Sequence, residues 1–581
     1  MSSYQVRFLS HIFHSQMSDD SDCFTYTSGP FFISDPAGNM VPKGTVTAKL
    51  VKDDDFIFLF QLYHGDSLLV SQQLDSSLDL YFKGEKTLEW VFRRADGQLQ
   101  HLRLVCEENT KAFKFAMSQA LLEVTTGKTL ESIVDEGDKE WVLGMHIQSH
   151  SDEPVDVDFD MDEGGHCAMT DDDEFEDCQA PVTAAPTAPT YKDLNPSDDE
   201  EEEEDEPERG AIRSSSYNTP RRPTKARSAP KSGRKNISVN VGAEANSLLV
   251  SGKAENRSFV VRNDQIGVFK YTDDGDLAYQ NKLRKIKAQT GETIHADLVQ
   301  LHSLDKQLLL VDKDDKSKVH QVDLETGKVI DTWMGDDHVK FESLAPKTKY
   351  AQTTAEEMVV GTSTTGLFSI DPRINTKNKM ADQFFYKDKN VGLQSITTTG
   401  SGYVAVASNK GDIRLFNKIG KGYCKTQLPG LGNPILHIDT TEDGTWLVAT
   451  CKTYLLVFPL ITSAGKTGFE ARMGSEKPMP LKLTITPEDQ VKYNITDISF
   501  TPAKFNTGTL ANSYEQWIAT SCGNWVITWD FEKVKKGQRN AYKFKNTTAE
   551  VVSDVFRHNN MNELVVAHTD DVFMSRIKKN K

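Results

Sequence analysis

The chain has 581 residues, more than one ordinary domain needs, so two or three folded units are expected. Hydrophobic residues make up 38%, enough to build buried cores. No apolar run reaches the about 18 residues of a membrane-spanning helix, and the first residues lack the basic-then-apolar pattern of a secretory signal. Seven scattered cysteines favour reduced thiols, as in the cytosol or nucleus, over a disulfide framework.

The net charge of −18 comes from one segment of the chain. Residues 151–210 hold 24 acidic and two basic residues, a net of −22, which leaves about +4 for the rest. A basic tract follows at residues 213–235, and it is expected to contact its own acidic segment, another anionic partner or the nuclear import machinery. Dense like charge and few aromatic residues leave too little apolar surface to offset chain entropy. We therefore predict a disordered linker, acidic then basic, over residues 136–236.

Residues 1–135 predict a small β-rich domain. Strands are expected at residues 45–51 and 56–63, separated by the acidic turn Lys52–Asp55. Residues 89–92 and 101–105 predict a hairpin, because the Asp-Gly pair between them is a favoured turn sequence.

The apolar period then changes from that of a strand to that of a helix. Phe113, Met117, Ala120 and Leu121 form one apolar helical stripe, and Asn109 or Thr110 is the expected N-cap. Strands closed by one C-terminal helix resemble a pleckstrin-homology-like β-barrel, although no sharp motif supports that assignment.

From residue 237 onward the chain repeats one pattern: an apolar strand, a polar turn, an apolar triplet ending in a small residue, a second turn and an alternating strand. Seven copies are spaced about 40–60 residues apart, which matches the period of propeller blades with loop insertions. They begin near residues 258, 298, 341, 393, 435, 495 and 551.

The predicted fold class is therefore mainly β, with a seven-bladed WD40-like β-propeller over residues 237–581 beside the smaller N-terminal domain. Two β-sandwiches would also explain the strands, but they would not explain the recurring triplet. Residues 237–241 read as an additional strand that pairs with the last blade and closes the ring.

Four segments of the predicted propeller resemble the vacuolar import and degradation protein 27 family. They are residues 257–274, 406–416, 449–456 and 499–508. The resemblance covers residues 237–581. The N-terminal domain and the acidic segment also lie where that family carries a pleckstrin-homology-like domain and an acidic stretch. It implies a cytoplasmic WD-repeat-like protein associated with delivery of cytosolic cargo to the vacuole, without assigned catalytic residues. The chain departs from ordinary WD repeats, since it lacks Gly-His dipeptides and has one Trp-Asp pair, Trp529-Asp530.

The sequence predicts no catalytic, cofactor or metal site. Residues 156–163 resemble a calcium loop, but Met161 and Cys167 occupy the positions that need Gly and Glu. His166, Cys167 and Cys178 offer three soft ligands without a fourth. Nucleophile-elbow, zinc-protease and phosphate-loop motifs are also missing, so the chain is predicted not to be an enzyme.

The predicted protein-binding residues lie in two blade turns. Lys410, Asp412 and Arg414 surround a glycine turn, and core packing does not explain their charges. Asp371 and Arg373 form a similar pair after a strand of the preceding blade. The alternative hypothesis is that Asp412 and Arg414 form an ordinary salt bridge within one blade.

Two linker positions are predicted phosphorylation sites. Ser197 precedes three acidic residues, and Thr219 precedes a proline. A phosphate adds about −1.5 to −2 charges, so it would alter any contact between the acidic and basic parts of the linker.

The function predicted from these features is a monomeric, non-catalytic protein-interaction scaffold linked to vacuolar import and degradation. Its protein partners are not identified, and no nucleic acid is expected. Two alternatives stay open: a membrane-surface adaptor that binds anionic lipid weakly through the N-terminal domain, and a propeller enzyme with histidines or carboxylates converging on the channel.

Overall fold

The structure is a computed structural model that describes residues 23–150 and 245–577, apart from short gaps. The gaps are residues 77, 95, 135, 147, 254–255, 273–276, 337–338, 388–390, 421, 508–514, 548, 559 and 561. The described residues belong to one compact unit. Several predicted features lie outside them: Ser197, Thr219, the calcium-like run, His166, Cys167, Cys178, the basic tract and the proposed closing strand at residues 237–241.

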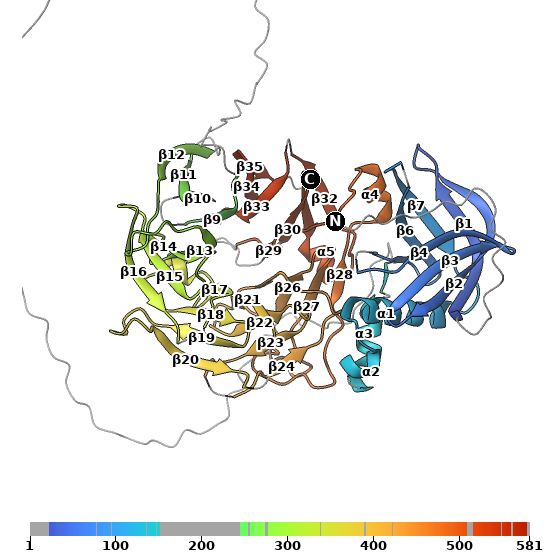
Figure 1. Ribbon diagram of the computed structural model, residues 1–581, viewed down its shortest axis with the longest axis horizontal. Coiled ribbons are helices and arrows are strands. Elements are labelled where there is room, and N and C mark those ends of the chain that lie inside the picture. The colour runs from blue at the N-terminus through green and yellow to red at the C-terminus, as the bar shows by residue number, and fades with distance from the viewer. Residues whose placement is uncertain are drawn as a thin grey trace, which may run out of the picture. The chain divides into compact units, whose positions relative to one another are not determined.

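One eight-stranded sheet makes up most of the N-terminal part (Figure 1), and all its pairings are antiparallel except β5 with β8. The predicted strands at residues 45–51 and 56–63 fall in β2 and β3, and the predicted hairpin joins β6 to β7. In order across the sheet, the strands are β4 (Ser67–Gln73), β3 (Ile57–His64), β2 (Met40–Asp54), β1 (Cys23–Ser34), β7 (Leu99–Val105), β6 (Thr87–Arg93), β5 (Tyr81–Lys83) and β8 (Ser149–His150).

Helix α1 (Thr110–Thr126) packs its apolar stripe against this sheet. Phe113, Met117, Ala120 and Leu121 are all buried in one cluster with the sheet's aromatic residues, as the helical spacing predicts. Asn109 occupies the N-cap position, but its side chain makes no capping hydrogen bond. The strand and helix predictions are confirmed, whereas the pleckstrin-homology-like assignment stays a prediction.

The predicted start of the linker at residue 136 is wrong, because the chain remains folded up to residue 150. After α2 (Leu130–Ile133) and η2 (Glu136–Asp138), α3 (Lys139–His146) buries Val142, Leu143 and Met145 in a core cluster. The acidic residues around position 136 make this segment resemble the linker in composition, although its short apolar stretch is buried. That burial stabilises the helix.

A buried charge network on β6 and β7 gives the N-terminal sheet a pH-dependent element. Glu89 accepts bonds from His101 Nε2 at 3.1 Å and Arg103 Nε at 2.6 Å. Burial on its own would raise the pKa of Glu89, but its bonds to His101 and Arg103 outweigh burial and hold the pKa below the ordinary value.

Replacing Glu89→Gln should destabilise the protein at neutral pH and have less effect in acid. A carboxyl whose pKa is lowered in the folded state stabilises above its unfolded pKa, and that contribution is lost as pH falls through the folded pKa. Urea unfolding of both proteins from pH 7 downward should show the difference shrinking. A difference that stays constant with pH would contradict this assignment.

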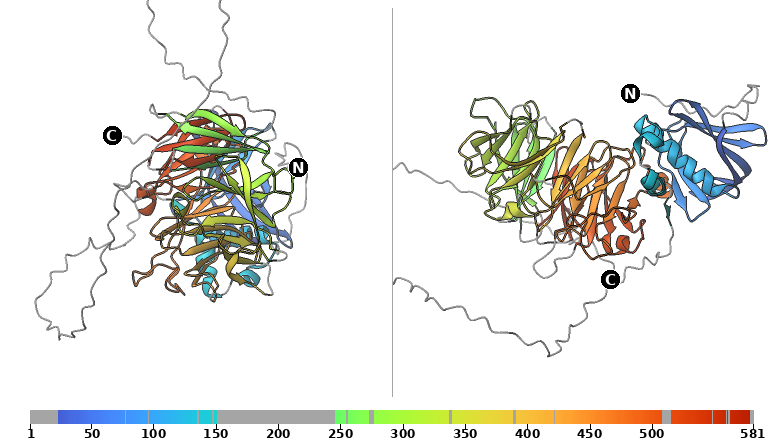
Figure 2. Two further views of the ribbon diagram at one scale, coloured as in Figure 1. Left: turned by 90° about the vertical axis from the view of Figure 1, so that its left-hand side faces the viewer. Right: turned by 90° about the horizontal axis from the view of Figure 1, so that it is seen from below.

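The C-terminal part is a ring of seven antiparallel sheets, which confirms the predicted seven-bladed β-propeller (Figures 1 and 2). The first strand of each blade lies nearest the axis, since these strands contact those of neighbouring blades. From inner to outer strand, blade 1 consists of β9 (Leu248–Ser251), β10 (Arg257–Arg262), β11 (Gln265–Tyr271) and β12 (Leu277–Leu283), and blade 2 consists of β13 (Ala296–His302), β14 (Gln307–Asp312), β15 (Lys318–Asp323) and β16 (Lys328–Met334). Blade 3 consists of β17 (Ser343–Pro346), β18 (Val359–Ser363), β19 (Gly366–Ile370) and β20 (Met380–Phe385). Blade 4 consists of β21 (Leu393–Thr398), β22 (Val404–Ser408), β23 (Ile413–Phe416) and β24 (Thr426–Leu428).

The last three blades follow the same plan, with three described strands in blade 7. Blade 5 consists of β25 (His437–Thr440), β26 (Trp446–Thr450), β27 (Leu455–Pro459) and β28 (Leu481–Leu483). Blade 6 consists of β29 (Lys504–Phe505), β30 (Trp517–Cys522), β31 (Trp525–Asp530) and β32 (Tyr542–Asn546). Blade 7 consists of β33 (Val551–Phe556), β34 (Glu563–His568) and β35 (Val572–Arg576). Short helical turns lie in three connections: η3 (Ala351–Thr353), α4 (Pro487–Lys492) and α5 (Phe531–Lys535).

Two of the predicted blade starts differ from the structure. Blade 1 begins at Leu248, so the strand expected at residue 258 is its second strand. In blade 6 the segment at 495–500 is not a strand, and the inner strand is the two-residue β29. Apolar residues of segment 495–500 are nevertheless buried in the blade core, which explains why their pattern resembles a strand.

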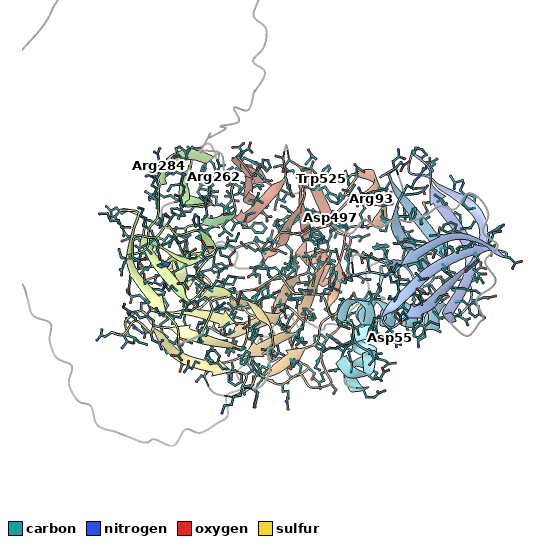
Figure 3. The ribbon with its side chains drawn as sticks, in the orientation of Figure 1. Asp55, Arg93, Arg262, Arg284, Asp497 and Trp525 are labelled. Atoms are coloured by element: carbon teal, nitrogen blue, oxygen red, sulfur yellow. The ribbon has the colours of Figure 1, made fainter. Side chains whose placement is uncertain are left out.

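Side chains fill the space between neighbouring blades (Figure 3), as in the cluster that joins blades 2 and 3. There the rings of Phe341 and Phe368 meet edge-to-face with centroids 5.5 Å apart. The ring is closed by bonds from Asn246, before β9, to blade 7: its N–H donates to Thr569 O and its Nδ2 to His568 O, both at 2.7 Å.

Buried hydroxyl–carboxylate bonds connect blades 6 and 7 without the usual WD dipeptides. Asp554 accepts from Thr501 Oγ1 at 2.7 Å and from Ser521 Oγ at 2.8 Å. The single Trp-Asp pair has another role, because Asp530 caps α5 by accepting from the Lys533 N–H. The chain therefore connects its blades through residues that a WD motif would not identify.

Candidate functional site

The turn between β22 and β23 holds the first group of predicted binding residues. Ser408 Oγ accepts from the backbone N–H groups of Lys410 at 3.2 Å and Asp412 at 3.1 Å. Gly411 has a φ of +91°, a conformation that L side chains rarely adopt, so glycine is required there. The turn leaves the Lys410 side chain exposed.

Asp412 and Arg414 form an ion pair within blade 4. Arg414 Nη2 lies 3.1 Å from Asp412 Oδ2, and the exposed fractions of the two side chains are 8% and 26%. Burial raises the pKa of Asp412, and Arg414 offsets part of that effect. The intra-blade salt bridge considered as the alternative is present, and a binding role for these residues stays a prediction.

Asp371 and Arg373 form a separate ion pair that the fold does not bring to the same surface. Two bonds join them, Nε to Oδ1 at 2.8 Å and Nη2 to Oδ2 at 2.9 Å. They follow the end of β19, whereas Asp412 precedes β23. Because β19 and β23 are third strands of successive blades, these positions lie on opposite faces of the propeller.

Replacing Arg414→Ala should lower the free energy of unfolding by about 1–3 kcal/mol, because it leaves the partly buried Asp412 carboxyl without its partner. Replacing the exposed Lys410→Ala should change it by less than about 0.5 kcal/mol. Urea unfolding of the two variants gives this comparison. Equal losses would mean that the turn, and not the ion pair, determines stability.

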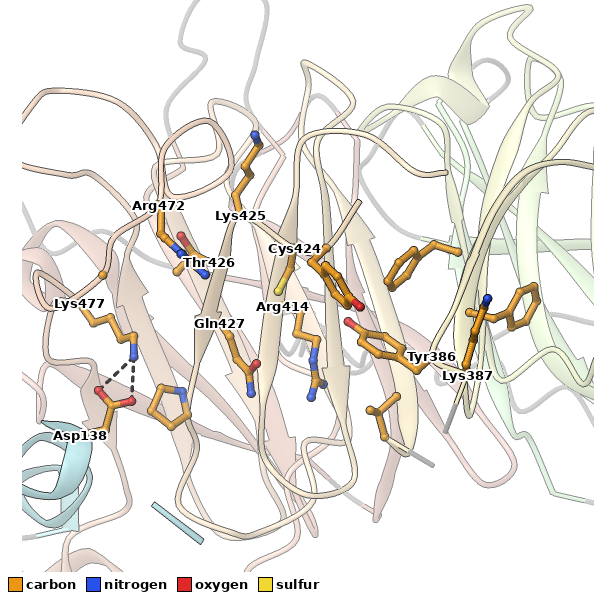
Figure 4. A pocket seen from close by; sticks show the side chains of 16 residues that line it. Asp138, Tyr386, Lys387, Arg414, Cys424, Lys425, Thr426, Gln427, Arg472 and Lys477 are labelled. Atoms are coloured by element: carbon orange, nitrogen blue, oxygen red, sulfur yellow. Dashed lines mark hydrogen bonds and ion pairs between the residues drawn. The ribbon is translucent and has the colours of Figure 1, made fainter. Parts of the chain in front are cut away.

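Arg414 also lines a large pocket of about 1050 Å³ on the outer side of blade 4 (Figure 4). One wall follows β20 of blade 3, the floor includes β24, and the long connection between β27 and β28 of blade 5 supplies the other wall. The pocket thus joins residues from three successive blades, and we call it the lateral pocket. Its lining residues used below are Phe384, Tyr386, Lys387, Arg414, Tyr423, Lys425, Arg472 and Lys477.

Aromatic rings form one side of the lateral pocket. The Tyr386 ring centroid lies 5.4 Å from Arg414 Cζ, a cation–π distance. Phe384 packs edge-to-face against Tyr386 at 5.0 Å and Tyr423 at 5.7 Å between ring centroids. Tyr423 is 81% exposed, the largest exposure among the large hydrophobic side chains of the described chain.

The charge of the lateral pocket is positive. Among the described residues, five cationic side chains and one carboxylate line it, and that carboxylate, Asp138, is bonded to Lys477 Nζ at 2.8 and 3.0 Å. Within the described residues, the side chains of Lys387, Lys425 and Arg472 make no hydrogen bond or ion pair. Three exposed cations therefore remain available to an anionic ligand.

Two buried donors also lack partners in the described part of the chain. Arg414 Nη1 and Tyr386 Oη are enclosed but form no hydrogen bond. Burial raises the pKa of Tyr386 to about 12 despite the nearby Arg414 guanidinium, so its hydroxyl keeps its proton at neutral pH. Buried donors without acceptors are costly, and a ligand that brings an acceptor would remove that cost.

The central channel, of about 260 Å³, is a second concave site, lined by the pair Lys349–Asp439 and by Lys504, whose pKa burial lowers. Lys349 Nζ lies 2.8 Å from Asp439 Oδ1, and Asp439 Oδ2 accepts from the Phe505 N–H at 2.9 Å. Burial lowers the pKa of both His437 and His558 to about 4, so they are neutral near pH 7. Among the described residues, no group of three or more His, Cys, Asp or Glu is arranged to hold a metal ion.

Sequence reasoning found Arg414 but missed the other residues of the lateral pocket. Phe384, Tyr423 and Arg472 lie on three different blades, so no local spacing relates them. The one available signal was Tyr423 itself, an aromatic residue placed among glycine and lysine in a polar loop.

Within the described residues, no helix combines the length and apolarity that crossing a membrane requires.

A family model described as the VID27 C-terminal WD40-like domain matches residues 244–581. Vacuolar import and degradation protein 27 of Schizosaccharomyces pombe is 39% identical over 340 residues, which cover 57% of this chain and 42% of that protein. The protein of the same name from Saccharomyces cerevisiae is 37% identical over 353 residues, covering 58% and 44% respectively.

The chain thus spans less than half the length of the curated relatives it matches. The match coincides with the observed propeller, whose blades diverge from ordinary WD repeats, and it covers more than half of the chain. The chain belongs to the family defined by the VID27 C-terminal WD40-like domain.

Proposed function

We propose that this chain is a non-catalytic cytoplasmic scaffold that binds a protein partner in the lateral pocket and thereby acts in vacuolar import and degradation of cytosolic cargo. The name of the two fungal relatives, vacuolar import and degradation protein 27, supports the process. The propeller supports the scaffold role, since it holds loops from several blades on a rigid frame.

The lateral pocket is the observation that carries the protein-binding role. It combines an exposed aromatic side chain, Tyr423, with the buried and incompletely bonded Arg414. Tyrosine and arginine are enriched among residues that dominate binding energy at protein interfaces. The volume of about 1050 Å³ is at the upper end of small-molecule sites, which suits a peptide segment.

The bonded state of Asp439 and the low pKa values of two histidines in the central channel support a non-catalytic role. Asp439 accepts bonds from Lys349 and from the Thr440 and Phe505 N–H groups, which occupy three of the about four acceptor positions of its carboxylate. His437 and His558 have pKa values of about 4, far from the near-neutral value that suits a general base.

Protein turnover measured by pulse labelling and mass spectrometry tests the proposed process. In cells from which the chain has been removed, cytosolic proteins normally degraded by vacuolar proteases should persist, and the wild-type chain should restore their loss. A Tyr423→Ala variant should restore it poorly at normal abundance, because the substitution removes an exposed side chain and leaves the core intact. Unchanged vacuole-dependent turnover after removal of the chain would overturn the proposal.

A further inference from the structure

We propose that the lateral pocket recognises an acidic segment of the partner protein, whose Asp and Glu side chains bind Arg414, Lys425 and Arg472. This inference rests on the proposed protein-binding function and adds the chemistry of the partner. It follows from the charge, the unsatisfied donors and the shape of the pocket.

Charge excludes most other protein segments from this pocket. The side chains of Lys387, Lys425 and Arg472 have no described partner, and Lys477 binds the only carboxylate among the described lining residues. A basic segment would meet like charge, and a purely apolar segment would remove water from these cations without replacing it. A segment with several carboxylates provides partners for all three.

Arg414 is held ready to receive one of those carboxylates. Its Nη2 is fixed by Asp412 at 3.1 Å and its plane lies beside the Tyr386 ring, while Nη1 remains without a partner. The side chain is 8% exposed, so its conformation is already restricted before a ligand arrives. Pre-organisation of this kind reduces the entropy lost on binding. The free Tyr386 hydroxyl, facing the same pocket, is a second donor.

The distribution of cations favours an extended acidic segment over a single phosphate group. Figure 4 shows Arg472 and Lys425 on one side of the pocket, Arg414 in the middle and Lys387 on the other side. Charges that converge on one point would suit a phosphate, whereas charges spread across the pocket suit successive carboxylates. Tyr423 lies at the rim and offers an apolar surface to a neighbouring side chain of the segment.

The chain's own acidic run, Asp198–Glu206, has the same chemistry and could compete within the molecule. A tethered competitor acts at a high effective concentration. The binding experiment therefore uses two forms of the full chain, the natural one and one in which all nine acidic residues of this run are replaced by serine. The probe is a fluorescent peptide, Asp-Asp-Glu-Glu-Glu-Glu-Glu-Asp-Glu, and its control is the Asn/Gln equivalent.

The acidic peptide should bind both forms of the chain, and the neutral peptide should bind neither. Lys425→Glu with Arg472→Glu should weaken binding by at least about tenfold without changing the melting temperature, because both side chains are exposed. Lys328→Glu is the control, since Lys328 is exposed on β16 of blade 2 and does not line the pocket. It should leave binding unchanged, while added salt should weaken the wild-type complex.

Three results would overturn the inference: equal binding of the two peptides, equal effects of the pocket variant and the Lys328 variant, or no binding at all. Binding that appears only after the run is replaced would also overturn it, by assigning the pocket to the chain's own segment. The turnover experiment above could still succeed in each of these cases, so failure of this inference is distinct from failure of the proposed function.

Discussion

Replacing Lys349→Met is expected to destabilise the propeller by about 3–5 kcal/mol, the usual effect of removing one member of a buried ion pair. Lys349 and Asp439 come from blades 3 and 5 and meet at 2.8 Å in the central channel, with side-chain exposed fractions of 9% and 15%. Burial on its own would lower the pKa of Lys349, but Asp439 outweighs burial and raises the pKa above its ordinary value. The ammonium therefore stays charged, and its removal leaves a carboxylate in a confined site.

The double variant Lys349→Met with Asp439→Asn separates this cost from a loss of packing. The amide carries no charge and keeps one acceptor oxygen, for either the Phe505 or the Thr440 N–H group, which donate to different oxygens of Asp439. Chemical unfolding of the wild type, both single variants and the double variant gives the coupling energy. The double variant should be more stable than Lys349→Met, and equal stability of these two proteins would argue against an uncompensated charge.

Replacing Trp529→Ala should cost about 3–5 kcal/mol, the range measured for large aromatic residues in protein cores. Trp529 has no exposed surface, and its ring lies 5.3 Å from Tyr542 and 6.2 Å from Phe500 between centroids. Its Nε1 also donates to Arg539 O at 3.1 Å. Truncation therefore leaves a cavity in blade 6 and an acceptor without its donor, and calorimetry should record a lower melting temperature.

Two matched variants test which part of Trp529 matters. Trp529→Phe keeps most of the apolar volume and loses the Nε1 bond, so it should cost less than alanine. Trp525→Ala removes a half-buried ring of the same blade, which packs on Tyr493 and Phe544, and should also cost less. A larger loss of stability for Trp525→Ala than for Trp529→Ala would contradict the placement of Trp529 at the centre of the blade 6 core.

The spacing of apolar residues in the sequence identified elements that are buried on one face and strands that are buried on both. The stripe Phe113, Met117, Ala120 and Leu121 predicts α1 because a helix against a sheet needs apolar residues every three or four positions. The recurring triplets predict the second strands of the blades, such as β22 and β26, because both faces of these strands are buried.

Periodicity failed where neighbours, and not the local pattern, determined the structure. Residues 495–500 carry a strand-like pattern but pack as an irregular segment beneath β30. The helix α3 was hidden because its apolar residues are few and follow acidic ones, and it is stabilised by the core cluster that Val142 and Met145 join. In both places tertiary packing outweighed local preference.

For the predicted binding residues, too, the local sequence indicated some features and tertiary packing determined the others. The glycine requirement at Gly411 follows from the turn sequence, and the φ of +91° agrees with it. Arg414 was selected because packing did not explain its charge, yet sequence alone did not indicate that its guanidinium would be buried beside Tyr386. Asp371 and Arg373 resemble the first pair in sequence but lie at the other end of their strand.

The sequence by itself determined the mainly β fold, the seven repeats and the position of the charged segment, since each depends on local composition or spacing. Only the tertiary structure decided which charges are paired and which remain available. Lys349 is bonded to a carboxylate 90 positions along the chain, whereas the side chains of Lys425 and Arg472 have no partner among the described residues around the lateral pocket. Such differences arise because closing the ring brings distant blades together, and the energy of a charge depends on the neighbours it acquires there.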